Sequence, residues 1–138
     1  MMSGLIDELW RAACEVRTHA YAPYSGYPVG AAIALEESDT IHTGCNVENS
    51  SYGATLCAER SAVLQAVAAS GPNISIRHLV LVTRHPAPPC GLCLQVLSEF
   101  SRPDTSIYLC SPDALSDPRP FSSFLPHPFS PDSLTDNV

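Results

Sequence analysis

The amino-acid sequence predicts an α/β fold in which helices cover both faces of one central sheet. Segments with strand character alternate with segments of helical spacing, and the first strand segment is a continuous apolar run typical of burial. Apolar residues make up 45% of the chain and charged residues 15%, which is typical of a globular protein. The 138 residues suffice for one core, so we expect a single three-layer domain over residues 1–138.

The first part of the chain predicts a helix followed by a hairpin. Apolar residues recur at helical spacing over residues 5–20, which indicates an amphipathic helix. A loop containing Pro, Ser and Gly follows at residues 23–28. Residues 29–35 then form an apolar strand segment, and residues 40–45 form a plausible returning strand after a polar turn.

The second part predicts two helices that alternate with two strands. Residues 57–70 favour a helix whose apolar residues lie nearly all round, so we expect this helix to be buried. A β-branched strand is expected at residues 78–83, a helix at residues 91–100 and a short strand at residues 106–110. The segment 111–138 is rich in Pro and Ser, so we expect only short helical pieces there.

The charge pattern argues against a polymeric nucleic-acid substrate. The formal net charge is -7, and the seven basic residues are all Arg, placed singly along the chain. No basic stripe is available to bind a phosphate backbone. The N-terminus lacks the pattern of a signal peptide, and no apolar run approaches the length of a membrane span. We therefore expect a cytoplasmic protein without a membrane partner, in which the six cysteines are reduced.

Two short motifs carry the chemistry. They are Cys57-Ala58-Glu59 and Pro89-Cys90-Gly91-Leu92-Cys93, and Cys90 lies 33 residues after Cys57. The combination C-x-E with P-C-x-x-C matches the zinc deaminases, in which the Glu is not a metal ligand. Three protein ligands leave one tetrahedral position for water, as in catalytic zinc sites. The pairing therefore predicts a catalytic Zn²⁺ held by three cysteines: Cys57, Cys90 and Cys93.

The spacing of these residues is compatible with two helix N-termini that meet at the metal. Cys90 and Cys93 are three residues apart and can face one way in a first helical turn. Cys57 should lie at a helix entry with Glu59 in the first turn, and the helix dipoles favour thiolates. Three thiolates give the zinc site a net charge of about −1. We therefore hypothesise that Arg60 donates a hydrogen bond to the sulfur of Cys57 and restores acidity to the metal.

Each motif taken alone has a simpler interpretation. A lone P-C-x-x-C is as often a structural zinc half-site or a redox pair, and a lone C-x-E carries little information. The other three cysteines are interpreted as core thiols, and the five histidines lack the spacing of metal ligands. These residues are Cys14, Cys45 and Cys110, and His19, His42, His78, His85 and His127.

Longer stretches resemble the homotetrameric, all-cysteine cytidine deaminases. The resemblance lies in residues 44–52 (GCNVENSSY) with residues 57–60, in the N-terminal loop at residues 20–30, and in the C-terminal segment at residues 124–129. It implies a three-layer α/β/α cytidine deaminase-like fold with a central five-stranded mixed sheet. It also implies one zinc per subunit, a homotetramer whose sites are shared between subunits, and a C-terminal segment at the subunit interface.

The same resemblance implies roles for individual residues. Asn46 and Glu48 match the residues that hydrogen-bond the ribose hydroxyl, and the backbone N–H of Ala58 would face the carbonyl oxygen of the pyrimidine. Tyr27 falls where the family usually has a Phe that packs on the base or sugar. Without the resemblance, Asn46 would be interpreted as a turn residue and Glu48 as a solvated loop carboxylate.

Two aromatic residues and the zinc surroundings complete the implied site. Phe129 matches the aromatic residue that reaches into the site of a neighbouring subunit, and Tyr52 is expected to contribute across the same interface. The family usually continues its P-C-G-x-C motif with Arg-Gln, whereas this chain has Leu94 and Gln95. Gln95 is therefore expected beside the zinc ligands. Because the Arg is missing, compensation of the thiolate charge depends more on Arg60.

The expected reaction is hydrolytic deamination of free cytidine and 2'-deoxycytidine to uridine and 2'-deoxyuridine plus ammonia, a step of pyrimidine salvage. A zinc-activated hydroxide would attack C4 of the base, with Glu59 as the proton shuttle. Two alternatives remain. One is a deaminase of a cytosine-nucleoside antibiotic of the blasticidin S type. The other is a non-catalytic binding module stabilised by zinc, which would require a closed, four-ligand site.

Overall fold

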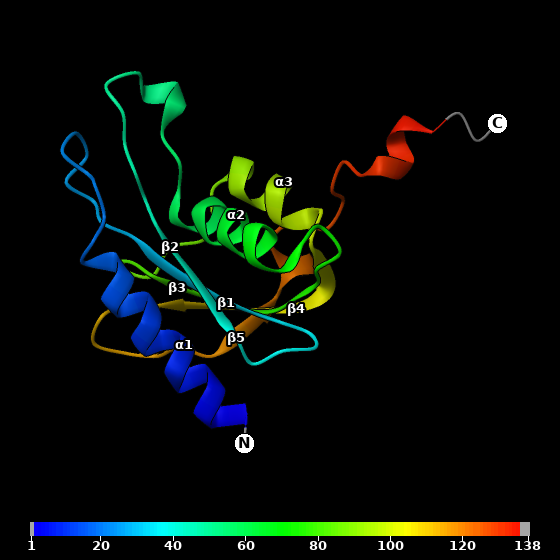
Figure 1. Cartoon of the computed structure of the whole chain (residues 1–138), viewed down its shortest axis with the longest axis horizontal. Coiled ribbons are helices and arrows are strands. Elements are labelled where there is room, and N and C mark those ends of the chain that lie inside the picture. The colour runs from blue at the N-terminus through cyan, green and yellow to red at the C-terminus, as the bar shows by residue number, and fades with distance from the viewer. Residues whose placement is uncertain (1, 136–138) are drawn as a thin grey trace.

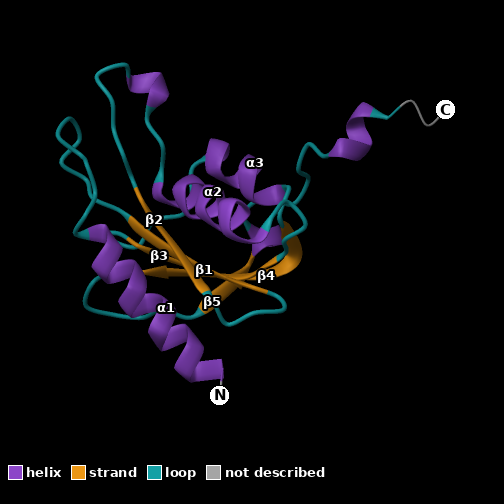
Figure 2. Ribbon diagram, viewed as in Figure 1, coloured by secondary structure: helices purple, strands orange, loops and turns teal. Residues whose placement is uncertain are grey.

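Five strands form one mixed sheet, flanked by helices on both faces (Figure 1, Figure 2). The computed structural model describes residues 2–135. The strand order is β2-β1-β3-β4-β5, and all neighbours are antiparallel except β3 and β4, which are parallel. The strands are β1 (Gly30–Leu35), β2 (Ile41–Cys45), β3 (Ile76–Val82), β4 (Ser101–Cys110) and β5 (Pro118–Pro120). This arrangement confirms the predicted three-layer α/β fold with a five-stranded mixed sheet.

The helical layers bury alternate residues of the central strands. Helix α1 (Met2–Arg17) covers one face, and α2 (Ala58–Ser70) and α3 (Gly91–Ser98) cover the other (Figure 1). Ala32 and Ala34 of β1 belong to the core beneath α1, whereas Ile33 lies in the core beneath α2 and α3. Because both faces are covered, all six residues of β1 are buried, which explains its continuous apolar run.

The topology brings the starts of α2 and α3 to the same edge of the sheet. Gly30 pairs with both Cys45 and Val82, so β2 and β3 end level with each other. Helix α2 is reached from the end of β2, and α3 from the end of β3. Two helix N-termini therefore meet at one sheet edge, as the motif spacing predicted.

Two loops project beyond that edge. The loop at residues 18–29 lies beside the loop at residues 46–57, which contains the short 3₁₀ helix η1 (Tyr52–Ala54) (Figure 1). The N–H of Tyr21 donates to the carbonyl of Asn46 at 3.0 Å, and the N–H of Glu48 donates to the carbonyl of Tyr21 at 2.8 Å. The two loops are thus joined through their main chains and form one wall above the sheet edge.

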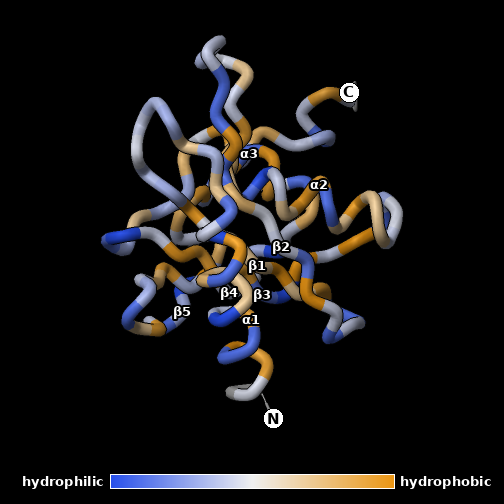
Figure 3. Tube along the Cα trace, turned by 60° about the vertical axis from the view of Figure 1, so that its left-hand side comes forward, coloured by the Kyte–Doolittle hydropathy of each residue, from blue (hydrophilic) through white to orange (hydrophobic). Residues whose placement is uncertain are grey.

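Helix α2 differs from its sequence prediction. Its buried residues lie on the side that faces the sheet and α3, whereas Leu64 on another side is 55% exposed. Figure 3 shows both hydrophobic and hydrophilic residues along this helix. The prediction of a fully buried helix is therefore wrong for the single chain, because α2 packs on one side only.

Several predicted element ends differ from the structure by one to five residues. Helix α1 ends at Arg17 and α3 at Ser98, each a few residues earlier than predicted, because the following residues form turns. Strand β4 begins at Ser101 rather than at residue 106. Its register against β3 shifts after Ser101, and regular pairing resumes at Ser106, where the sequence predicted the strand.

The C-terminal segment contains a strand that the Pro-rich sequence concealed. Strand β5 pairs with β4 at the sheet edge, the position at which Pro is tolerated in a sheet. The 3₁₀ helices η2 (Phe121–Ser123) and η3 (Pro131–Leu134) follow, in agreement with the predicted short helical pieces. Residues 1 and 136–138 of the predicted domain lie outside the described residues. Within residues 2–135, none of the helices combines the length and apolar character needed to cross a membrane.

Candidate active site

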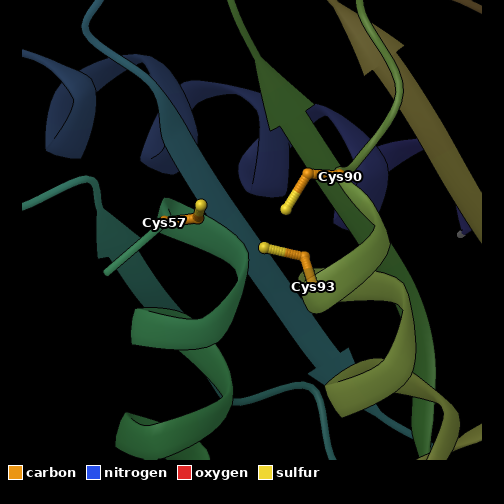
Figure 4. A group of neighbouring side chains, drawn as sticks. All are labelled: Cys57, Cys90 and Cys93. Atoms are coloured by element: carbon orange, nitrogen blue, oxygen red, sulfur yellow. The ribbon is translucent and has the colours of Figure 1, made fainter. Parts of the chain in front are cut away.

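Three cysteine sulfurs converge where α2 and α3 begin (Figure 4). Cys57 and Cys90 are the residues that precede α2 and α3, and Cys93 lies in the first turn of α3. Their Sγ atoms all lie within 4.8 Å of one another. Tetrahedral Zn²⁺ with Zn–S bonds of about 2.3 Å needs sulfurs about 3.8 Å apart, so a small adjustment would complete the site.

The donor set fits a zinc ion with one open position. Among residues 2–135, no His, Asp or Glu joins the three cysteines as a fourth ligand. Three thiolates are the soft donors that zinc accepts, and a free fourth position is typical of catalytic sites. The closed site required by the binding-module alternative is therefore not formed by the described residues.

Hydrogen bonds prepare Cys57 to act as a thiolate. Donation from the Cys93 thiol, and then from Arg60, lowers the pKa of Cys57 to about 5 against the opposing effect of burial. The pKa of Cys93 is raised, first because its thiol is held as the donor to Cys57 and then by burial. The cluster therefore holds a thiolate that a cation can bind, and metal binding would release the remaining protons.

Arg60 has the position that the sequence hypothesis requires. Its Nη2 lies 3.5 Å from the Sγ of Cys57 and donates at 3.2 Å to the carbonyl of Thr55. The guanidinium is partly buried and therefore less screened by water than an exposed charge would be. A single cation thus compensates part of the negative charge of the cysteine cluster.

Glu59 lies in the first turn of α2 and is only 5% exposed. Burial raises the pKa of its carboxyl to about 7, and the charge of Cys57 acts in the same direction. A carboxyl group that titrates near neutrality can both accept and release a proton during a reaction. The structure therefore places a carboxyl group that can exchange protons near neutral pH two residues from a cysteine of the cluster.

A cleft of about 260 Å³ opens beside these groups. Residues from both projecting loops, from the start of α2 and from the segment before α3 line it. They include Tyr27, Asn46, Glu48, Cys57, Ala58, Glu59, Thr83, Pro88 and Cys90. The cleft therefore joins two cysteines of the cluster and the carboxyl group of Glu59 to the residues predicted to hold a sugar.

Comparison with known proteins identifies the family. The profile of the cytidine and deoxycytidylate deaminase zinc-binding region matches residues 5–110. The chain belongs to this deaminase family. A cytidine deaminase of Sporosarcina psychrophila is 38% identical over 130 residues, which cover 94% of this chain and 95% of that protein.

Solved structures of deaminases share the fold. The crystal structure of cytidine deaminase from Burkholderia pseudomallei has a TM-score of 0.80 and 35% identity, covering 89% of this chain and 98% of that chain. The crystal structure of cytidine deaminase from Mycobacterium tuberculosis has a TM-score of 0.76 and 35% identity, covering 90% of this chain and 96% of that chain. The family match and the cysteine cluster together establish a zinc-dependent deaminase, a hydrolase.

Asn46 and Glu48 both bind main chain of the opposite loop in this deaminase. The side-chain amide of Asn46 bonds Tyr27 and Val29. One carboxylate oxygen of Glu48 accepts the N–H groups of Tyr24 and Ser25, both at 3.0 Å, and the other accepts the hydroxyl of Ser25. The hydrogen bond from the Ser25 hydroxyl contributes most to lowering the pKa of Glu48. Glu48 is therefore a carboxylate at neutral pH.

Other predicted residues of the deaminase do not meet in the cleft of a single chain. Tyr52 lies outside it and contacts Tyr24 edge-on, with ring centroids 5.8 Å apart. Phe129 is 57% exposed and is absent from the lining residues. The side-chain amide of Gln95 donates to the carbonyl of Phe129 at 2.9 Å, so it holds the C-terminal segment.

The cleft also contains residues that sequence reasoning missed. Thr83 lines it from the segment between β3 and α3, and Ser25 and Thr55 line it from the projecting loops. A usable signal existed for Thr83, because a polar residue at the end of a buried strand commonly faces a site. Nothing in the sequence indicated that the hydroxyl of Ser25 would bond Glu48.

Proposed function

We propose that this enzyme removes the 4-amino group of free cytidine and 2'-deoxycytidine, giving uridine or 2'-deoxyuridine and ammonia. The observation that carries the proposal is that Glu59 shares one cleft with two zinc ligands and with Asn46 and Glu48. The relatives named cytidine deaminase, matched over nearly the whole chain, support this substrate. A role in cytoplasmic pyrimidine salvage, which recovers free nucleosides, is part of the same proposal.

The reaction assigns the proton transfers to Glu59. When bound, zinc supplies a Lewis acid that makes water nucleophilic at neutral pH. Glu59 takes a proton from the attacking water and delivers it to N3 of the base, which makes C4 electrophilic. A C–O bond forms at C4. Glu59 then takes the proton of the new C4 hydroxyl and passes it to the amino group, and the C–N bond breaks to release ammonia and leave the C4 carbonyl. The low exposure of Glu59 keeps competing water away from this proton.

The remaining cleft residues orient the nucleoside. The N–H of Ala58 belongs to the first turn of α2, where N–H groups have no helical partner, and it is available to the carbonyl oxygen of the pyrimidine. Tyr27 offers a ring to the base or sugar, and Glu48 and Asn46 form the wall for the sugar. The Glu48 carboxylate and the net charge of -7 disfavour a phosphate at this wall.

We also propose a homotetramer with one zinc per subunit, in which Phe129 and Tyr52 complete the site of a neighbouring subunit. The exposure of both rings and the exposed side of α2 at Leu64 support this assembly. Light scattering should give four times the chain mass of 14.8 kDa. A monomeric mass for the active enzyme would contradict the assembly.

The test is the loss of ultraviolet absorbance when purified, zinc-loaded protein is mixed with cytidine or 2'-deoxycytidine. We expect the wild-type protein to deaminate both nucleosides. In Glu59→Gln the turnover rate should fall about 10²- to 10⁴-fold at unchanged zinc content, because the proton shuttle is lost. Glu15→Gln, an exposed carboxyl group in α1, is the matched control and should retain the wild-type rate.

Absence of turnover in wild-type protein that carries one zinc per chain would contradict the proposed substrate. The antibiotic alternative then becomes the next assay, with blasticidin S in place of cytidine. Unchanged turnover in Glu59→Gln would instead contradict the assigned proton shuttle.

A further inference from the structure

Ser25 lies in the projecting loop at residues 18–29, and its hydroxyl bonds the carboxylate of Glu48 in the neighbouring loop. We propose that Ser25 is a positioning residue that fixes the orientation of the Glu48 carboxylate, and that it thereby favours nucleosides whose sugar carries a 2' or 3' hydroxyl. The inference rests on the proposed function, because it concerns the sugar wall of the same cleft.

Three donors from two consecutive residues hold the carboxylate. The N–H groups of Tyr24 and Ser25 both donate to Oε1 of Glu48 at 3.0 Å. The hydroxyl of Ser25 donates to Oε2. The two N–H groups bind a single oxygen, so by themselves they would leave the carboxylate free to turn about that oxygen. The hydroxyl binds the second oxygen and therefore fixes the plane of the group.

The direction of the Ser25 hydroxyl is determined by its two partners. The N–H of Tyr27 donates to the same hydroxyl oxygen at 3.0 Å. An N–H can only donate and an ionised carboxylate can only accept, so the single hydroxyl proton must point to Glu48. This bond contributes most to lowering the pKa of Glu48, with the N–H groups acting in the same direction and burial opposing them. Ser25 therefore also keeps the carboxyl group charged.

These bonds leave one defined position for a ligand. A carboxylate has about four acceptor positions, two on each oxygen. From the described residues Oε1 receives two donors and Oε2 receives one, so the open position lies on Oε2. Ser25, Tyr27 and Glu48 all line the cleft that contains Glu59. A sugar hydroxyl in this cleft would therefore donate to the oxygen that Ser25 orients.

The turn that carries Ser25 is held by main-chain groups as well as by its side chain. The N–H of Gly26 donates to the carbonyl of Ala22 at 2.9 Å, and the φ of Gly26 is 64°, a left-handed conformation that glycine adopts without strain. The N–H of Glu48 also donates to the carbonyl of Tyr21 at 2.8 Å. Removal of the Ser25 hydroxyl should therefore change the support of the carboxylate without unfolding the loop.

The kinetic test compares Ser25→Ala with wild type on two substrates. We expect kcat/KM on cytidine to fall roughly 3- to 30-fold, a moderate loss because water can partly replace a hydrogen bond at an exposed residue. On 2',3'-dideoxycytidine, which lacks the 2' and 3' hydroxyls, the fall should be less than about twofold. Ser25→Thr, which keeps a hydroxyl on the same carbon, should retain most of the activity on cytidine.

Ser38→Ala is the matched control. Ser38 is an exposed serine in the turn between β1 and β2, and its hydroxyl accepts the N–H of Thr40 at 3.0 Å, as the hydroxyl of Ser25 accepts the N–H of Tyr27. This turn lies at the end of β1 opposite the cleft, because Gly30 and Cys45 pair at the cleft end. The control should leave kcat/KM unchanged on both substrates.

An equal fall of kcat/KM on cytidine and 2',3'-dideoxycytidine in Ser25→Ala would overturn the proposal. Ser25 would then act on the base or through Tyr27, and not through the carboxylate that meets the sugar. Unchanged kcat/KM on cytidine would overturn it as well.

Carboxyl NMR gives a readout that does not depend on catalysis. The side-chain signal of Glu48, assigned by its absence in Glu48→Gln, reports the pKa of this group. The pKa should be higher in Ser25→Ala than in wild type, because a bond to the charged form is lost, and unchanged in Ser38→Ala. An equal pKa in Ser25→Ala and wild type would contradict the positioning role. If wild-type protein fails to deaminate cytidine, the proposed function fails, and the titration still decides whether Ser25 holds Glu48.

Discussion

At the scale of single residues, Cys57 and Glu59 are two positions apart but are driven toward opposite protonation states. Hydrogen bonds from Cys93 and Arg60 lower the pKa of Cys57 to about 5, whereas burial raises the pKa of Glu59 to about 7. Cys57 lies at the helix entry, where polar partners reach it, and Glu59 points into the protein from the first turn. The start of α2 therefore supplies both the proposed metal ligand and the proposed proton carrier from one turn of chain.

The contact between Arg60 and Cys57 leads to a prediction about charge. Arg60→Gln removes the cation whose Nη2 lies 3.5 Å from the sulfur. We expect turnover to fall about 10- to 100-fold at unchanged zinc content, because the metal becomes a weaker Lewis acid. Steady-state kinetics and zinc analysis check this. Arg11→Gln, an exposed residue paired with Asp7, is the control, and equal turnover in both variants would refute the charge role.

Sequence reasoning correctly predicted which residues of the two short motifs lie together. Cys57, Cys90 and Cys93 converge as predicted, and Arg60 reaches Cys57 as the three-residue separation suggested. It failed where a side chain has several possible partners. The amide of Gln95 bonds the carbonyl of Phe129, which is 34 residues away, and no local pattern indicates such a partner.

At the scale of elements, the position of α2 depends on a close approach to β2. A Cβ added at Gly44 would lie 2.3 Å from the N of Ala62 and 2.6 Å from the carbonyl oxygen of Ala58. Both are helix backbone atoms, so the helix itself would have to move. The G-C-N stretch at residues 44–46 thus contains a glycine whose lack of a side chain allows α2 to pack this close to β2.

Gly44→Ala should therefore displace the start of α2. We expect a loss of roughly 1–3 kcal/mol in the free energy of unfolding, together with weaker zinc retention, because Cys57 moves with the helix. Urea unfolding and competition with a zinc chelator measure the two effects. Gly4→Ala, where nothing lies within 4 Å of the added Cβ, is the control and should be neutral or slightly stabilising. If Gly44→Ala had the same free energy of unfolding and the same zinc retention as wild type, this interpretation would be contradicted.

At the scale of the whole molecule, His78 links folding to pH. It lies in β3 on the face covered by α1, is 3% exposed, and contacts the ring of Tyr108 edge-on. Neither ring nitrogen has a hydrogen-bond partner among residues 2–135. Burial lowers the pKa of His78, the charge of Arg77 adds to this, and Glu36 opposes it.

The lowered pKa determines the direction of the pH effect. The unfolded chain binds a proton at His78 near pH 6.5, whereas the folded chain binds it only at lower pH. Neutral His78 therefore makes its full contribution to the free energy of unfolding above about pH 6.5. This contribution is lost as the pH falls toward the pKa of His78 in the folded chain. When the pH is lowered from about 8 to about 5.5, the free energy of unfolding should fall less in His78→Leu than in wild type.

Urea unfolding at both pH values, with zinc present, measures this difference. His19→Gln, an exposed histidine, is the control and should keep the pH dependence of the wild type. An identical pH dependence in His78→Leu and wild type would show that His78 is not linked to folding in this way. Because the ring nitrogens lack partners, Leu should cost little stability at the higher pH.

The amino-acid sequence by itself predicted the order of helices and strands as far as β4, and the two short motifs whose cysteines and glutamate lie together at one sheet edge. These depend on local periodicity and on spacing of a few residues, which the chain carries in any conformation. The tertiary structure alone decided which side of α2 is buried, that β5 pairs with β4, and that the amide of Asn46 binds Tyr27 and Val29. The physical reason is that these features arise from contacts between distant segments. The chemistry of an Asn or Ala side chain is the same whichever residues surround it. Only the folded structure determines which residues these are.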